Sequence, residues 1–164
     1  MLQLSDAPSW RALGRKAEAL LDSLQSLSRS HDEATFAKLE ANVYSCGDII
    51  DCAPAIAPHL VAFAEHLSEE QQIPYWRLLG SIVLWGDEFA VPDRVRNPFD
   101  IAVARARPLV LRCLVAESWS RITALELLWT LVGVLGARRV GKKPVRSCTC
   151  ERKRSVPRRR MPTL

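Results

Sequence analysis

The sequence predicts an all-α protein of about six short helices in antiparallel pairs, followed by a basic tail. Apolar residues recur at spacings of three and four along most of the chain, no stretch alternates apolar and polar residues, and no Asn-Gly or Asp-Gly hairpin turn is present. Hydrophobic residues make up 48% of the 164 residues, enough for one core. We therefore expect one helical domain, residues 1–137, and a tail, residues 138–164, that we expect to be disordered.

Charge separates these two parts. Residues 1–137 hold 12 Lys and Arg against 17 Asp and Glu, a net charge of −5. Residues 138–164 hold 11 Lys and Arg against Glu151 alone, a net charge of +10, so that the whole chain carries +5. An acidic body with a cationic tail assigns any contact with nucleic acid to the tail and not to the fold.

The cysteine content and the start of the chain predict a cytoplasmic location. Five cysteines are an odd number in a chain too large for a disulfide scaffold. Residues 1–6 lack the basic start and apolar run of a secretory signal.

Two helices are expected before Cys46. Ser9 offers a cap for the first, and Ser28–Glu33 is a polar break after it. The second helix ends near Cys46-Gly47. The apolar stripe of the first helix is Leu13, Ala17, Leu20, Leu21, Leu24 and Leu27, and that of the second is Phe36, Leu39 and Val43.

Prolines place the next two helices. A proline costs about 3 kcal/mol inside a helix but little in its first turn. We therefore expect a short turn or helix to Cys52 and then a helix from about Pro54 or Pro58 to His66. Ser68–Gln71 then reads as a cap with acids in the first turn. The helix that follows runs to Trp85, bent or restarted at Pro74.

A long loop, Gly86–Asn97, separates this half from the last two helices. Pro98 closes the loop, and Pro108 should kink or interrupt the helix after it. A turn at Glu117-Ser118 precedes a final helix from Ser120 to about Gly136. The stripe after the loop is Phe99, Ala102, Val103, Ala106, Val110, Cys113 and Leu114.

Two segments share a rhythm: Ala57–Ala64 opens with a proline and continues with leucine and small residues, and Arg107–Leu114 followed by Ser120–Leu128 repeats it. The second segment resembles a HEAT-type repeat, in which an acidic turn (here Glu117) precedes an arginine (Arg121) early in the second helix. Cys46–Leu67 resembles the start of bacterial HEAT-like, armadillo-type proteins of unknown function. Over about residues 36–137, the resemblance implies a short stack of helices with a curved binding surface and no shared catalytic residue.

Metal or catalytic chemistry is not predicted. Cys46, Cys52, His59 and His66 are potential zinc ligands, but their spacing matches no common zinc signature, so a capping or core role is expected. Two carboxylate pairs, Asp48 with Asp51 and Asp87 with Glu88, lie beside turns, where acids are usually solvated caps. The chain has no phosphate-binding glycine loop, nucleophile elbow or His-Glu-x-x-His motif, and we expect no cofactor and no enzyme activity.

Aromatic residues and the long loop are the candidate contact elements. Five tryptophans are interpreted as core residues, with an exposed anchor for a partner as the alternative; they are Trp10, Trp76, Trp85, Trp119 and Trp129. The loop mixes both charge signs with an aromatic ring, and long loops are usually functional or disordered. Its candidate partner-binding residues are Asp87, Glu88, Phe89, Asp93, Arg94 and Arg96.

The last helix is apolar almost all round, with Glu126 as its one charge between Ile122 and Ala137. The end helix of a stack normally has a polar outer face, so this one predicts self-association or a missing partner surface. A membrane span is not expected, because it needs about 20 apolar residues and this stretch has 16 residues in all, with Glu126 inside it.

Three interpretations of the tail stay open. It contacts nucleic acid, it serves an acidic partner, or it is the product of a shifted reading frame after about Gly136, which the alternative frames of the encoding DNA would decide. The candidate phosphate contacts are Arg152, Lys153, Arg154, Arg158, Arg159 and Arg160. The function expected from the whole sequence is a protein-binding or scaffold role, with nucleic-acid binding through the tail as the alternative.

Overall fold

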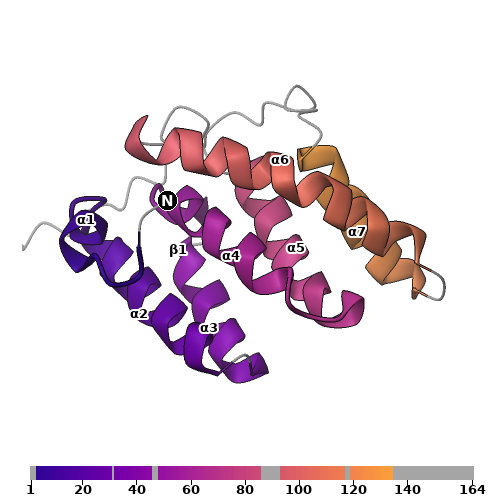
Figure 1. Ribbon diagram of the computed structural model, residues 1–164, viewed down its shortest axis with the longest axis horizontal. Coiled ribbons are helices and arrows are strands. Elements are labelled where there is room, and N and C mark those ends of the chain that lie inside the picture. The colour runs from indigo at the N-terminus through magenta and orange to yellow at the C-terminus, as the bar shows by residue number, and fades with distance from the viewer. Residues whose placement is uncertain (1–2, 31, 46–47, 86–92, 117–118, 135–164) are drawn as a thin grey trace, which may run out of the picture.

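The chain folds into a stack of helices (Figure 1), which a computed structural model describes for residues 3–30, 32–45, 48–85, 93–116 and 119–134. The prediction of an all-α class is confirmed. In these ranges the elements are α1 (Ala7–Arg11), α2 (Arg15–Arg29), α3 (Glu33–Val43), β1 (Tyr44–Ser45), β2 (Asp48–Ile49), the 3-10 helix η1 (Ala53–Ile56), α4 (Ala57–Ala64), α5 (Glu69–Trp85), α6 (Asp93–Val115) and α7 (Arg121–Val134).

The helices form two layers. One layer contains α3, α5 and α7: α5 packs against α7, and the rings of Phe36 on α3 and Tyr75 on α5 lie 4.9 Å apart. The other contains α2, α4 and α6: α4 packs against α6, and α2 contacts η1, which leads into α4. Within each pair, α2 packs on α3, α4 on α5 and α6 on α7, so that the core lies between the layers.

The first helix begins later than the sequence suggested. A separate short helix, α1, carries Trp10, and α2 starts only at Arg15. The break is at Gly14, whose φ of 117° is a conformation that residues with a Cβ rarely adopt. Trp10 is completely buried, and its indole N–H donates to the carbonyl oxygen of Gln3 at 3.1 Å. The expected continuous helix from Ser9 was therefore wrong, although its stripe from Ala17 to Leu27 is buried as predicted.

The prolines of η1 and α4 occupy different helix positions from those of α6. Pro54 and Pro58 lie in the first turns of η1 and α4, as predicted. Pro98 and Pro108 lie inside α6, which begins at Asp93 and continues without interruption to Val115. The predicted loop boundary at Asn97 was wrong, and of the kink or interruption predicted at Pro108, the interruption does not occur.

The buried stripe of α6 explains this outcome. Val95, one turn before Phe99, is buried with the rest of the stripe. Each proline removes one intrahelical hydrogen bond at a cost of about 3 kcal/mol, whereas each fully buried apolar side chain stabilises the helix by roughly 1.5–3 kcal/mol. Four large residues of the stripe, Val95, Phe99, Val103 and Val110, are enough to offset two prolines, and the smaller Ala102, Ala106 and Cys113 are buried beside them.

A two-residue antiparallel pair was not predicted. Tyr44 pairs with Ile49, and Ser45 pairs with Asp48, which turns the chain from α3 toward η1. Strands of two residues are too short for an alternating pattern, so periodicity could not have found them.

Candidate functional site

The candidate zinc ligands that the structure describes, Cys52, His59 and His66, are not grouped as a metal site. Cys52 is buried after β2, His59 is buried on α4 with its ring 5.8 Å from that of Trp10, and His66 is exposed beyond the end of α4. Cys46 lies outside the described residues. Within the described ranges, no group of three or more His, Cys, Asp or Glu side chains is arranged to hold a metal ion.

An open cleft of about 370 Å³ lies between the start of α2 and the segment after β2. Its polar groups come from Arg15, Lys16, Asp51 and Cys52. Burial, and secondarily the charge of Asp51, raises the pKa of the Cys52 thiol, which keeps it in the protonated, weakly nucleophilic form. The cleft therefore has no feature of an activated thiol.

The residues of the predicted partner-binding loop are divided by the start of α6. Asp87, Glu88 and Phe89 lie outside the described residues. Asp93 opens α6 and lies 3.9 Å from Arg96 in an exposed ion pair. The guanidinium of Arg94 donates to the carbonyl oxygen of Ala12 and so ties the start of α6 to the α1–α2 connection. The structure thus shows an intramolecular contact for Arg94, while a role in partner binding stays a prediction.

A buried polar network, which sequence patterns did not reveal, joins α5 to α6. The side-chain oxygen of Gln72 accepts hydrogen bonds from the indole N–H of Trp76 and the thiol of Cys113, both at 3.2 Å. The amide nitrogen of Gln72 donates to the carbonyl oxygen of Leu67 at 2.9 Å. Burial raises the pKa of the Cys113 thiol, so it remains a neutral donor to Gln72. The network fixes the core and offers no exposed reactive group.

Contacts with α5 hold α7 in place. The Thr130 hydroxyl lies 3.0 Å from the carbonyl oxygens of both Trp76 and Glu126. Gly80 leaves so little room that a Cβ there would lie 2.8 Å from the Cα of Thr130. Close approach of the two helices therefore depends on a glycine on α5.

Arg77 links three helices on the surface of the α3–α5–α7 layer. Its guanidinium lies 3.3 Å from the carboxylate of Glu40 on α3 and 3.9 Å from that of Glu126 on α7. The single charge that the sequence placed on the last helix, Glu126, is therefore paired with a residue of α5, two helices earlier in the chain. This pairing joins residues 49 positions apart along the chain, which a local pattern cannot show.

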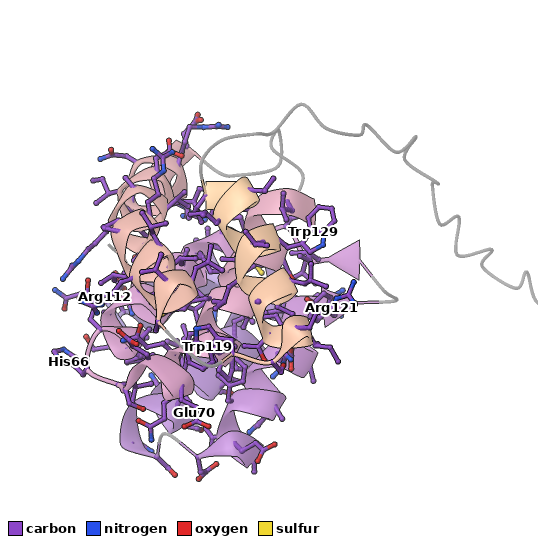
Figure 2. All side chains as sticks on the ribbon, turned by 90° about the vertical axis from the view of Figure 1, so that its right-hand side faces the viewer. His66, Glu70, Arg112, Trp119, Arg121 and Trp129 are labelled. Atoms are coloured by element: carbon purple, nitrogen blue, oxygen red, sulfur yellow. The ribbon has the colours of Figure 1, made fainter. Side chains whose placement is uncertain are left out.

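The outer face of α7 is the most unusual surface of the described residues. Figure 2 looks onto this end of the molecule, where Trp129 and Arg121 project from the same side of α7. Five large apolar side chains are exposed on this face, namely Ile122 (72%), Leu125 (49%), Leu128 (44%), Trp129 (62%) and Val132 (37%). We call these five residues the α7 outer face. On the opposite side, Leu127, Thr130, Gly133 and Val134 are buried.

The tryptophans divide between core and surface. Trp10 and Trp76 are completely buried, and Trp119 is half-buried with its indole N–H donating to the carbonyl oxygen of Cys113. For Trp129, the prediction of a core role was wrong, because 62% of it is exposed. The side chain of Trp85 lies outside the described residues. An exposed tryptophan within an apolar face is typical of a contact surface.

Two further predictions concern a membrane span and the basic residues of the tail. Among those residues, no helix has both the length and the apolar character that crossing a bilayer requires. The candidate phosphate contacts Arg152–Arg154 and Arg158–Arg160 lie outside the described residues.

Comparisons with protein-family models, with curated proteins and with solved structures find no match to this chain.

Proposed function

We propose that this protein is a non-enzymatic binding or scaffold protein, built as a short HEAT-like stack, and that it contacts another polypeptide through the α7 outer face. The observation that carries the proposal is the exposure of five large apolar side chains on one helix at the end of the stack. Exposed apolar patches of this kind mark interaction sites, because leaving them in water costs free energy that a partner recovers by covering them.

The layered arrangement supports the HEAT-like part of the proposal. Helices α3, α5 and α7 stack in one layer and α2, α4 and α6 in the other, as successive helix pairs do in a solenoid. Pro58 opens α4 and Arg121 stands at the first position of α7, in agreement with the repeat pattern, whereas Pro108 departs from the pattern because it lies inside α6. In such stacks an end helix has a polar outer face, whereas an internal one is covered by its neighbour. The α7 outer face has the composition of an internal helix.

The free thiols of Cys52 and Cys113 agree with the proposed location in a reducing cytoplasm. The acidic body and cationic tail support the second candidate function, nucleic-acid binding through residues 138–164. The two functions are separable because they use different parts of the chain.

Site-specific photo-crosslinking in cells tests the first function. A benzophenone amino acid replaces Trp129 in the full chain, and the matched control places it at Ile101, which is 59% exposed on α6. We expect covalent adducts with a polypeptide at position 129 and none at position 101. Absence of adducts at both 129 and 125 would overturn the proposal.

Deletion of residues 138–164 tests the second function. If the tail binds nucleic acid, the full chain is retained on immobilised DNA or RNA at low salt and released at high salt, and the deletion variant is not retained. The same deletion is expected to leave the adducts at position 129 unchanged.

A further inference from the structure

The exposed apolar residues of α7 have the spacing of a helix–helix seam. Ile122, Leu125, Trp129 and Val132 follow one another at intervals of three, four and three residues. This is the a/d pattern of two heptads, which lines one side of a helix and packs against a second helix. Because α5 and α6 cover the opposite side of α7, the seam faces outward.

Residues 138–164 do not have the apolar pattern of a helix that could cover this seam. Residues 138–164 include 11 Lys and Arg. Their large aliphatic residues are only Val140, Val145, Val156, Met161 and Leu164, without the three-and-four spacing of an amphipathic helix. We therefore look for the occupant outside residues 138–164.

We infer that the occupant is the α7 outer face of a second copy of this chain. The two helices pack antiparallel, and the two-fold axis crosses the seam at the level of residue 127 along α7. Such an axis places Ile122 opposite Val132 of the second copy and Leu125 opposite Trp129 of the second copy. Each large ring then meets a smaller side chain, and every seam residue has a partner. A two-fold interface uses the same patch on both molecules, so one exposed face is sufficient to close the assembly.

The flanks of the seam are also self-complementary. On the side toward α5, Glu126 is paired with Arg77 at 3.9 Å, so each carboxylate that the axis brings near its own copy already has a basic partner. Leu128 lies on the other flank, one residue from the axis, where it meets Leu128 of the second copy. Arg121, at the first position of α7, approaches the carbonyl end of the partner helix, which carries partial negative charge.

Charge also selects the antiparallel direction. A parallel pair would bring together the two segments that follow α7, each with a net charge of +10 over residues 138–164. An antiparallel pair separates the starts of these segments by the length of α7, roughly 20 Å at 1.5 Å per residue. This distance exceeds the Debye length of about 8 Å at physiological ionic strength, so the repulsion is largely screened.

The size of the face predicts a weak dimer. Trp129 and four aliphatic side chains offer on the order of 500 Å² of apolar surface per copy, at the upper end of what a typical monomer exposes. Two such faces bury about 1,000 Å², the lower limit for a specific interface. We therefore expect a weak dimer, in the micromolar range or above, and not a tight one.

This inference rests on the proposed use of the α7 outer face, and sedimentation equilibrium on the full chain tests it. We expect a monomer–dimer equilibrium for the wild type and at least about 100-fold weaker association for Trp129→Glu, since a carboxylate would be desolvated at the seam. The matched control, Ile101→Glu, replaces an equally exposed apolar residue on α6 and should leave the equilibrium unchanged. Circular dichroism establishes that each variant is folded.

Cysteine crosslinking tests the direction of packing. With Cys46, Cys148 and Cys150 replaced by serine, the buried Cys52 and Cys113 remain, and one new cysteine is added at Leu128 or at Ile122. In the antiparallel dimer the two copies of position 128 are offset by about 3 Å along the helix direction, and those of position 122 by about 15 Å. A short bismaleimide should therefore join Leu128→Cys molecules and not Ile122→Cys molecules.

The outcomes separate this inference from the proposed function. Preferential crosslinking at position 122, or a wild type that stays monomeric at about 1 mM, would overturn the antiparallel dimer. If photo-crosslinks at position 129 then join a different polypeptide, the proposed function stands without self-association. If they join nothing, both fail.

Discussion

Helices α2 and α7 lie near opposite ends of the stack (Figure 1). Their solvent-exposed sides differ in polarity. The exposed side of α2 carries Arg15, Lys16, Glu18 and Asp22, and its buried side carries leucines and Ala17. The exposed side of α7 carries five large apolar residues and begins with Arg121. An end helix that faces water has a polar outer side, and α2 follows this rule whereas α7 does not.

The inner sides of the two helices do not differ in this way. Leu20, Leu24 and Leu27 of α2 are completely buried, and on α7 Leu127 and Val134 are buried to the same degree within about 1%. Thr130 and the close approach at Gly80 fix α7 against α5. The contrast therefore indicates that α7 is an integral part of the fold with one side left for a contact, and the predictions below test both halves of that statement.

The largest effect is expected from comparing two tryptophans. Trp76 is completely buried with its indole N–H bonded to Gln72, so Trp76→Ala should lower the free energy of unfolding by about 3–5 kcal/mol. Trp129→Ala should change the unfolding of the monomer by no more than about 0.5 kcal/mol, because the ring is mostly exposed. Urea unfolding measures the change for both variants, at protein concentrations too low for the chain to associate. A large loss for Trp129→Ala would show that the α7 outer face is needed by the fold itself.

The buried polar network gives the next effect. Replacing Gln72 by leucine removes the acceptor of the Trp76 indole N–H and leaves that donor buried without its partner. We expect a loss of about 1–3 kcal/mol in the free energy of unfolding. The matched control is Gln3→Leu, the same substitution at an exposed residue ahead of α1. Equal losses in the two variants would mean that the network does not stabilise the α5–α6 contact.

Two glycines at the α5–α7 contact predict a smaller effect with opposite signs. In Gly80→Ala the new Cβ would lie 2.8 Å from the Cα of Thr130, and since backbone must move, we expect a net loss of about 1–2 kcal/mol. In Gly133→Ala the nearest atom is Cγ of the Leu84 side chain at 3.0 Å, which can shift. The higher helix propensity of alanine, about 1 kcal/mol, should then leave Gly133→Ala neutral or stabilised. Thermal unfolding of both variants measures the difference, and a stabilised Gly80→Ala would contradict close docking of α7.

Much of this architecture could be predicted from periodicity, because burial imposes a repeat on the sequence. Local patterns revealed the apolar stripes from Ala17 to Leu27 and from Phe99 to Cys113, and also the apolar composition of all sides of α7. The break at Gly14 was hidden because Leu13 lies four residues before Ala17, in register with the stripe of α2. The start of α6 was misplaced because Pro98 and Val95 favour different boundaries, and the outcome depended on what Val95 packs against.

The candidate site divides in the same way. The unfinished outer side of α7 was predictable, since it follows from composition alone. Exposure of Trp129 in particular, and the pairing of Arg77 with both Glu40 and Glu126, were not, because they depend on which side of each helix meets its neighbour. The spacing of apolar residues along one helix does not contain such non-local information.

The smallest expected effect concerns how the helices near the two ends are capped. Asp32 caps α3: its carboxylate accepts from the amide N–H of Thr35 at 2.7 Å and from the hydroxyl of Ser30. These bonds, the Ser30 hydroxyl foremost and then the Thr35 amide, lower the pKa of Asp32 from 3.8 to about 2. Because the folded-state pKa is lowered, the stabilisation is fully present above about pH 4 and is lost as the pH falls through about 2. At α7 the cap is the hydroxyl of Ser120, which accepts from the amide N–H of Thr123 at 3.1 Å and does not titrate in this range.

Acid should therefore loosen the start of α3 and leave the start of α7 unaffected by its own cap. Amide hydrogen exchange of Thr35 and Thr123, followed from pH 5 to pH 2 and corrected for intrinsic rates, compares the two ends in one molecule. Asp32→Asn keeps an acceptor oxygen but cannot titrate, so protection at Thr35 should become independent of pH in that variant. If Thr35 in the wild type loses no more protection than in Asp32→Asn, the charge of Asp32 contributes nothing to the cap. The difference between the two ends would then lie only in their outer faces, which is where the α7 seam already places it.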